Sequence, residues 1–102
     1  MATMYFIVGT FYALPGKLPE LIAVLREERE LRKKITGTDT MVLTPVGGKF
    51  SEAKYRFQVE SLSEYEEEVK KLEADPEWQA LLKKGAALVV PNTSHMEIYR
   101  QV

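Results

Sequence analysis

The sequence contains no cysteine and only one histidine, His95. The lack of cysteine excludes disulfides, thiolate metal sites and a cysteine nucleophile. A single histidine without thiolates also falls short of the usual ligand sets of structural zinc. Neither a nucleophile elbow nor a Gly-rich phosphate loop is present, which argues against a serine hydrolase and against nucleotide cofactors. We therefore expect no metal and no cofactor.

The sequence also lacks an excess of one charge and a long hydrophobic run. It has 14 basic and 15 acidic residues, a net charge of -1, so nothing indicates binding to nucleic acid or to an anionic membrane. No apolar stretch approaches the roughly 20 residues of a membrane span, and no signal-peptide pattern is visible. A cytoplasmic location is the expectation. The length of 102 residues and a hydrophobic content of 45% predict one domain over residues 1–102.

The most apolar part of the sequence is Met4–Tyr12, MYFIVGTFY. Its aromatic and β-branched residues favour a strand. Alternate residues of a strand point to opposite faces, and here both faces are largely apolar, so both need to be covered. Gly9, in the middle, suggests a bulge or the close approach of a ligand or another backbone. Helices of a short chain can cover one face, and we expect a second subunit to cover the other.

The rest of the chain alternates between helical and strand patterns. The expected elements are a helix over about Leu18–Lys34, strands over Thr40–Val46 and Ala53–Glu60, a helix from Ser61 or Ser63, a short helix from Asp75-Pro76 to near Gly85, and a last strand over about His95–Val102. The order β-α-β-β-α-β predicts an α+β, ferredoxin-like sandwich, in which an antiparallel four-stranded sheet carries helices on one face. The first and third strands are central in that topology.

Two charged residues fall inside the apolar stripe of the first helix. Glu28 and Arg32 are four residues apart, with the acid first, which suits a helical ion pair. We expect the helix to extend past the sheet, so that both groups are solvated. The alternative is a charge pair at the mouth of a pocket.

Polar residues of the third and fourth strands form a first candidate site. Those expected on the face away from the helices are Arg56, Gln58, Glu60, His95, Glu97 and Tyr99. In a polar ligand site, Arg56 would bind a carboxylate or carbonyl, and Glu97 or His95 would move a proton. The alternative, which we favour, is a set of ion pairs that fix the register of a dimer. His95 by itself fits a general base, a haem ligand or a residue with no special role.

Aromatic residues between sheet and helices form a second candidate site. Tyr5 or Tyr12, together with Tyr65 and Trp78, would wall an apolar pocket. Ordinary core packing is the interpretation that we favour for them. The ligand-binding candidates from both sites are Tyr12, Arg56, Tyr65, Trp78 and Tyr99.

Three motifs resemble those of a known family. They are Leu14-Pro15-Gly16-Lys17-Leu18-Pro19-Glu20, Ser61-Leu62, and Ala74-Asp75-Pro76-Glu77-Trp78-Gln79-Ala80. The chain resembles the NIPSNAP family, one branch of the dimeric α/β-barrel superfamily. The resemblance implies a homodimer whose sheets close into a barrel with helices outside. That superfamily includes cofactor-independent monooxygenases, isomerases and haem-degrading enzymes. The haem-degrading relatives use an Asn on the first strand, and Met4–Tyr12 has none, which argues against that activity.

Two classes of function remain. The first is a dimeric small-ligand-binding or interaction module without committed catalysis, which we favour because no set of residues commits to a reaction. The second is an oxygenase or isomerase without cofactor that acts on a small aromatic or polyketide-like molecule. The sequence leaves open whether the protein is an enzyme. Fold-level resemblance does not decide between the two classes.

Overall fold

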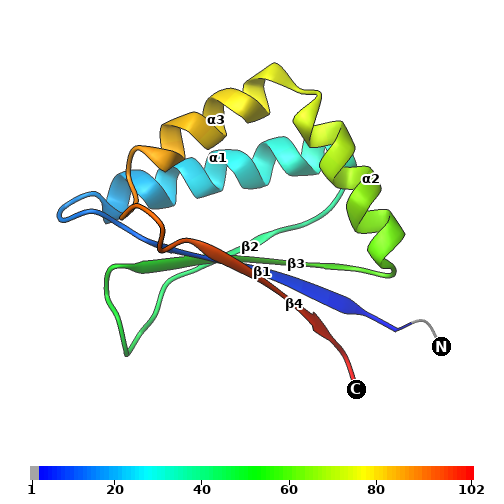
Figure 1. Ribbon diagram of the computed structural model, residues 1–102, viewed down its shortest axis with the longest axis horizontal. Helices are drawn as coiled ribbons and strands as arrows, with labels where there is room; N and C mark the ends of the chain where they lie inside the picture. The colour runs from blue at the N-terminus through cyan, green and yellow to red at the C-terminus, as the bar shows by residue number, and fades with distance from the viewer. Residues whose placement is uncertain (1–2) are drawn as a thin grey trace.

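A four-stranded antiparallel sheet carries three helices on one face (Figure 1). The computed structural model describes residues 3–102, so the first two residues of the predicted 1–102 domain lie outside it. The elements are β1 (Tyr5–Tyr12), α1 (Leu18–Thr36), β2 (Met41–Leu43), β3 (Glu52–Val59), α2 (Leu62–Glu73), α3 (Pro76–Ala86) and β4 (His95–Arg100). The strand order is β2-β3-β1-β4. This confirms the predicted α+β, ferredoxin-like topology with β1 and β3 in the centre.

The predicted second strand is longer than the observed one. Only Met41–Leu43 pair with β3, whereas a strand over Thr40–Val46 was expected. Pro45 has no N–H to donate to the ladder, and Gly48 adopts a left-handed φ of 87° that turns the chain. Val46, next to Pro45, is 99% exposed. The strand pattern therefore ends where the backbone can no longer pair.

The second and third helices begin at the capping residues that the sequence indicates. Ser61 Oγ accepts a hydrogen bond from the Glu64 N–H at 3.1 Å, and Asp75 Oδ1 accepts one from the Trp78 N–H at 3.0 Å. A side-chain oxygen at this position satisfies a backbone donor that the helix leaves free. The break at Asp75-Pro76 turns the chain, so that α3 runs back alongside α1 (Figure 1). Trp78, in the first turn of α3, is thereby buried against α1.

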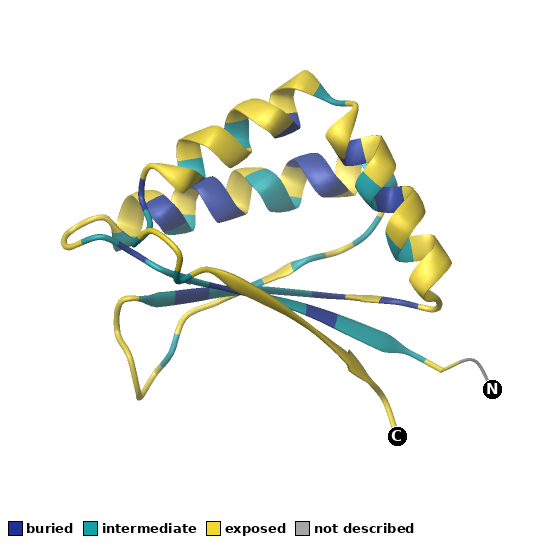
Figure 2. Ribbon diagram, viewed as in Figure 1, coloured by how far each residue is buried: buried dark blue, intermediate teal, exposed yellow. Residues whose placement is uncertain are grey.

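The two faces of the sheet differ in what covers them. Ile7, Ala53, Phe57 and Val59 point toward the helices and are buried, and Figure 2 shows the buried positions between helices and sheet. The alternate residues point away from all three helices. We call that side the open face; it consists of Phe6, Val8, Thr10, Tyr12, Met41, Leu43, Glu52, Lys54, Arg56, Gln58, His95, Glu97 and Tyr99. The expectation that helices cover only one face of the first strand is confirmed.

Gly9 makes room for a ring from the neighbouring strand. It pairs with Tyr55 in an uninterrupted register between β1 and β3. A Cβ atom at position 9 would lie 1.9 Å from Cε2 of Tyr55, so the tyrosine ring occupies the space above the glycine. The predicted bulge, or close approach of a ligand or backbone, is therefore wrong. A cross-strand side chain fills the place instead.

Candidate functional site

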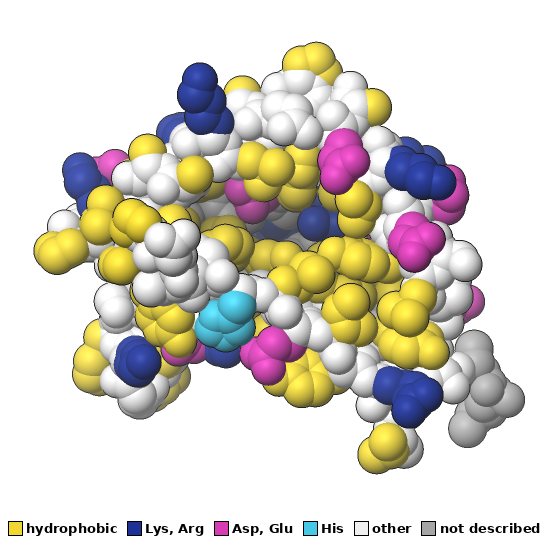
Figure 3. All heavy atoms as spheres, in the orientation of Figure 1, with side chains coloured by type: hydrophobic (Ala, Val, Ile, Leu, Met, Phe, Trp, Pro, Cys, Tyr) yellow, Lys and Arg dark blue, Asp and Glu magenta, His cyan; other side chains and the backbone are white. Residues whose placement is uncertain are grey.

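A pocket of about 310 Å³ lies between the helices and the sheet. Its walls are mainly apolar and come from Leu21, Val24 and Leu25 of α1, Phe11 of β1, and Trp78 and Leu82 of α3. Figure 3 shows the pocket as a hollow with apolar walls and charged atoms at its bottom. A volume near 300 Å³ is at the lower end of the range for small-molecule sites. The pocket thus has the size and the lining of a site for a small molecule.

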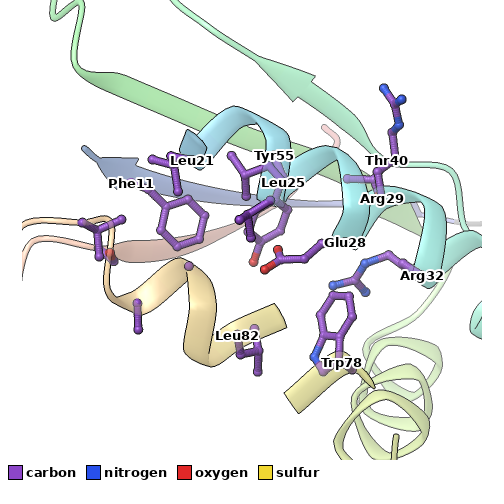
Figure 4. A pocket seen from close by; sticks show the side chains of 15 residues that line it. Phe11, Leu21, Leu25, Glu28, Arg29, Arg32, Thr40, Tyr55, Trp78 and Leu82 are labelled. Atoms are coloured by element: carbon purple, nitrogen blue, oxygen red, sulfur yellow. The ribbon is translucent and has the colours of Figure 1, made fainter. Parts of the chain in front are cut away.

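The polar residues of the lining include Glu28 and Arg32 from α1 and Tyr55 from β3 (Figure 4). The expectation that Glu28 and Arg32 are solvated is wrong, because Arg32 is only 7% exposed and Glu28 is half-buried. The reason is α3, which runs back over the part of α1 that would otherwise face water. A Cβ atom at Gly85 of α3 would lie only 3.9 Å from Glu28 Oε1, which shows how closely this helix passes.

The guanidinium of Arg32 lies between two aromatic rings. Its Cζ is 4.1 Å from the centroid of Phe57 and 5.1 Å from that of Trp78. These contacts stabilise a cation and fix its plane. Its Nη1 is buried and has no hydrogen-bond partner among residues 3–102. Burial lowers the pKa of Arg32, but arginine stays charged in proteins. A charged donor is therefore held beside the pocket with one buried nitrogen that lacks an acceptor.

Glu28 and Tyr55 extend into the same part of the pocket as Arg32. Burial raises the pKa of Glu28 from 4.5 to about 7, while the charge of Arg32 opposes this rise. Burial also raises the pKa of Tyr55 to about 12, so its hydroxyl remains a hydrogen-bond donor near neutral pH. In Figure 4 the carboxyl of Glu28 points toward the hydroxyl of Tyr55. Within the described residues, no ion pair joins Glu28 to Arg32.

A buried carboxylate from α2 helps to keep Arg32 charged. Glu68 is 5% exposed and accepts a hydrogen bond from Thr38 Oγ1. Its charge raises the pKa of Arg32 and partly offsets the effect of burial. Glu68 Oε2 and Thr40 Oγ1 are buried without partners among residues 3–102. Polar groups thus continue from the pocket toward the segment between α1 and β2.

The predicted catalytic candidates Arg56, Glu97 and His95 lie on the open face, away from the pocket. His95 Nε2 is 3.7 Å from Glu97 Oε1, and Tyr99 Oη donates to Glu97 Oε2 at 2.7 Å. Arg56 lies over the ring of Phe6, with 4.5 Å between Cζ and the centroid. Gln58 shares this face, whereas Glu60 follows the end of β3 and is exposed. The predicted grouping on the side away from the helices is therefore correct, except for Glu60.

Of the aromatic residues expected to wall a pocket, only Trp78 lines the pocket described above. Tyr12 faces the opposite way because it occupies an even position of β1, and its ring neighbours His95. Tyr5 and Tyr65 pack in the cluster around Phe57 instead. Phe11 and Tyr55 also wall the pocket, and neither was predicted to do so. The signal for Tyr55 was present, since a large residue on the helix-facing side of β3 lies opposite Gly9.

Both the sequence and the fold of the chain are similar to those of known proteins. The family model for NIPSNAP matches residues 7–102. The chain belongs to the NIPSNAP family. Among solved structures, it is similar to a NIPSNAP family protein from Agrobacterium tumefaciens, with 21% identity, a TM-score of 0.85, and coverage of 100% of this chain and 89% of the other. A second NIPSNAP family protein from that organism, one with unknown function, has 23% identity, a TM-score of 0.81, and coverage of 97% and 88%.

A more distant structure is SnoaB, a cofactor-independent oxygenase from Streptomyces nogalater. It has 13% identity and a TM-score of 0.71, with 94% of this NIPSNAP chain and 90% of the other covered. At such identities the likeness shows the fold alone. No curated protein is significantly similar to the chain. In the part of the chain that the structure describes, no helix is long and apolar enough to cross a bilayer, and no three His, Asp or Glu side chains are placed to hold a metal ion.

Proposed function

We propose that the chain is a small-ligand-binding protein whose pocket takes a mostly apolar molecule with one anionic or carbonyl group. Arg32 binds that group, and the walls around Phe11, Leu25 and Trp78 bind the apolar part. The observation that carries the proposal is the free Nη1 of a buried, ring-stacked arginine at the bottom of an apolar pocket. A buried donor without an acceptor costs free energy, and a ligand oxygen would remove that cost.

The only tryptophan of the sequence, Trp78, lines the pocket and supplies the measurement. Its fluorescence is recorded while phenylpropanoate or the uncharged phenylpropanamide is titrated into the purified protein. The two probes have the same ring and chain, so their difference isolates the contact to Arg32. We expect the carboxylate to bind about tenfold more tightly, since a hydrogen bond to a charged group is worth about 1.5 kcal/mol or more.

Variants of two arginines complete the binding test. Arg32→Met should abolish the preference for the carboxylate, while Arg26→Met, on an exposed position of the same helix, should keep it. Native mass spectrometry of protein without added ligand would reveal a retained small molecule. Equal affinity for the two probes, or a preference that survives Arg32→Met, would contradict the role of Arg32. A fluorescence signal that responds to neither probe would contradict ligand binding itself.

We further propose that two chains pair as a homodimer through the open face. This face exposes apolar side chains on both edge strands, with Met41 of β2 54% and Tyr99 of β4 50% exposed, and the partly buried Val8 lies on the central strand β1. It carries charges of both signs, since Lys54 and Arg56 lie on β3 and Glu97 on β4. A second copy related by a two-fold axis can cover these apolar side chains and pair with Arg56 and Glu97, which lie on either side of Val8.

Sedimentation velocity tests the dimer. The wild-type chain and Val46→Glu, a matched change in the exposed loop, should both sediment as dimers. Val8→Glu should sediment as a monomer, because two carboxylates would be buried at the centre of the interface. A monomeric wild-type chain, or a dimeric Val8→Glu, would contradict pairing through this face. The cytoplasmic location expected from the sequence stays a prediction, which fractionation of cells expressing the tagged chain would test.

A further inference from the structure

Beside the guanidinium of Arg32, on which the binding role rests, the pocket holds a carboxyl group and a phenol hydroxyl that this role does not use. We propose that the pocket catalyses proton transfer at a carbon next to a carbonyl group, with Glu28 as the general base and with Arg32 and Tyr55 binding the carbonyl oxygen. The substrate class is aryl ketones and related carbonyl compounds whose enolates are stabilised by an adjacent ring. This inference rests on the proposed binding function and assigns a reaction to the same site.

The position of Glu28 suits a base. It lies on the pocket-facing side of α1, one turn before Arg32, and its carboxyl points into the cavity rather than toward solvent (Figure 4). Among residues 3–102, no basic side chain lies within 4.0 Å of the carboxylate of Glu28 to form an ion pair, and no group donates a hydrogen bond to it. Its oxygens are therefore available to a ligand. The small residue Gly85 on α3 leaves room beside Oε1.

Arg32 and Tyr55 suit the stabilisation of an oxyanion. The guanidinium is clamped between Phe57 and Trp78, and the tyrosine ring is seated over Gly9, so neither group needs to reorganise when charge develops. Both enter the pocket beside Glu28 from different elements, α1 and β3. A ketone with its oxygen between the two donors would present its neighbouring carbon toward the carboxylate.

The reaction needs no oxidant and no cofactor. The Glu28 carboxylate takes a proton from the carbon, the electron pair of that C–H bond forms a C=C bond, and the carbonyl π electrons move to the oxygen. The resulting enolate oxygen is held by Arg32 and Tyr55. Glu28 then returns the proton, either to the same carbon or to a conjugated carbon further along. Return to a different carbon isomerises the substrate, and return to the same carbon exchanges its hydrogen.

The electrostatic surroundings fit a base that works near neutral pH. Desolvation in the pocket raises the pKa of Glu28 to about 7, a value at which a carboxyl group is both partly ionised and strongly basic. The ionisable groups around it are Glu27, Arg29 and Arg32 on α1, Tyr55 on β3, and Lys84 on α3, which is 3.8 Å from Glu27. The charge of Arg32 lowers the pKa of Glu28, whereas the charge of Glu27 raises it. Burial has a larger effect than either charge.

The test measures, by proton NMR, the hydrogen–deuterium exchange of phenylacetone and β-tetralone in D₂O. Wild-type protein should accelerate exchange above the buffer rate, with a rate that rises with pH through about 7 and then levels off. Glu28→Gln should lose about 100-fold or more of the acceleration, the usual contribution of a general base. Glu27→Gln, which removes an exposed carboxylate from the preceding position, should retain it. Glu28→Asp keeps a carboxylate at a greater distance and should restore part of the rate.

Trp78 fluorescence measured on the same ketones separates this inference from the binding proposal. If the ketones bind to both proteins but exchange hydrogen only with the wild type, Glu28 is supported as the general base. Exchange that is unchanged in Glu28→Gln overturns it. Ketones that bind to the wild type but exchange only at the buffer rate also overturn it, while the binding function stands. Ketones and carboxylates that both fail to bind overturn the two proposals together.

Discussion

Replacing Glu28 by glutamine is expected to stabilise the protein at about pH 8 and to have little effect at about pH 4. At about pH 4 the carboxyl is mostly protonated in both the folded and the unfolded chain. Between the ordinary value of 4.5 and the folded value of about 7, the unfolded chain releases the proton while the folded chain retains it. The free energy of unfolding of the wild type therefore falls as the pH rises through this range. Glutamine has the same shape and does not titrate.

The size of the effect follows from the pKa. A tenfold change in proton affinity is worth about 1.4 kcal/mol, so the rise to about 7 corresponds to about 3 kcal/mol above neutral pH. Glu28 is half-buried in a pocket that opens to solvent, and access to water reduces this cost. We therefore expect Glu28→Gln to raise the free energy of unfolding by about 2 kcal/mol at about pH 8.

Urea denaturation of both proteins at a series of pH values measures the difference. The difference in unfolding free energy between Glu28→Gln and the wild type should be near zero at about pH 4. It should rise mainly between pH 4.5 and 7 and level off above that range. Glu27→Gln is the control, because Glu27 is exposed and precedes Glu28 in the sequence. A difference between wild type and Glu28→Gln that does not change with pH would show that the carboxyl is not desolvated. If this difference instead fell as the pH rises, the pKa of Glu28 would be lowered in the folded chain. That outcome would also contradict the general-base role.

Three further substitutions test the packing around the pocket. Gly9→Ala should cost about 1–3 kcal/mol of unfolding free energy, because the added methyl collides with Tyr55; in a Tyr55→Leu background the cost in urea denaturation should be smaller. Arg32→Met should abolish carboxylate binding and lower the free energy of unfolding by about 3 kcal/mol, since it removes both ring contacts and leaves the buried carboxylate of Glu68 without the opposing charge; an unchanged thermal denaturation would contradict this. Asp75→Ala should cost about 1 kcal/mol by removing the cap of α3, and the Trp78 fluorescence should shift to the red, whereas Asp75→Asn should behave as the wild type.

The topology was predictable because its signals are local. The alternation in 53–60, the caps at Ser61 and Asp75, and the turn at Pro15-Gly16 each depend on a few neighbouring residues, and their order limits the arrangement of the sheet. The end of β2 was predicted less well, since the strand composition continues to Val46 while pairing stops earlier at Leu43. Composition describes which residues suit a strand, but Pro45 decides where the ladder can no longer continue.

The pocket was less predictable because its residues come together only in three dimensions. Glu28 and Arg32 were visible as charges within an apolar stripe, yet their burial depends on α3, which the break at Asp75-Pro76 directs across them. Tyr55 belongs to a regular alternating strand, and its place in the pocket depends on Gly9 in a strand more than 40 residues away. Single-sequence periodicity assigns a residue to a face and does not say which element will cover that face.

The seating of Tyr55 over Gly9 also bears on how this domain can diversify. The ladder hydrogen bonds between β1 and β3 are made by backbone atoms, so they do not depend on which strand supplies the bulk above position 9. A smaller residue at position 55 would enlarge the pocket by the volume of a ring, and a larger residue at position 9 would fill that volume again. Two reciprocal changes can therefore retune the ligand size that the domain accepts while its sheet stays the same. That makes the pair a natural starting point for redesigning selectivity.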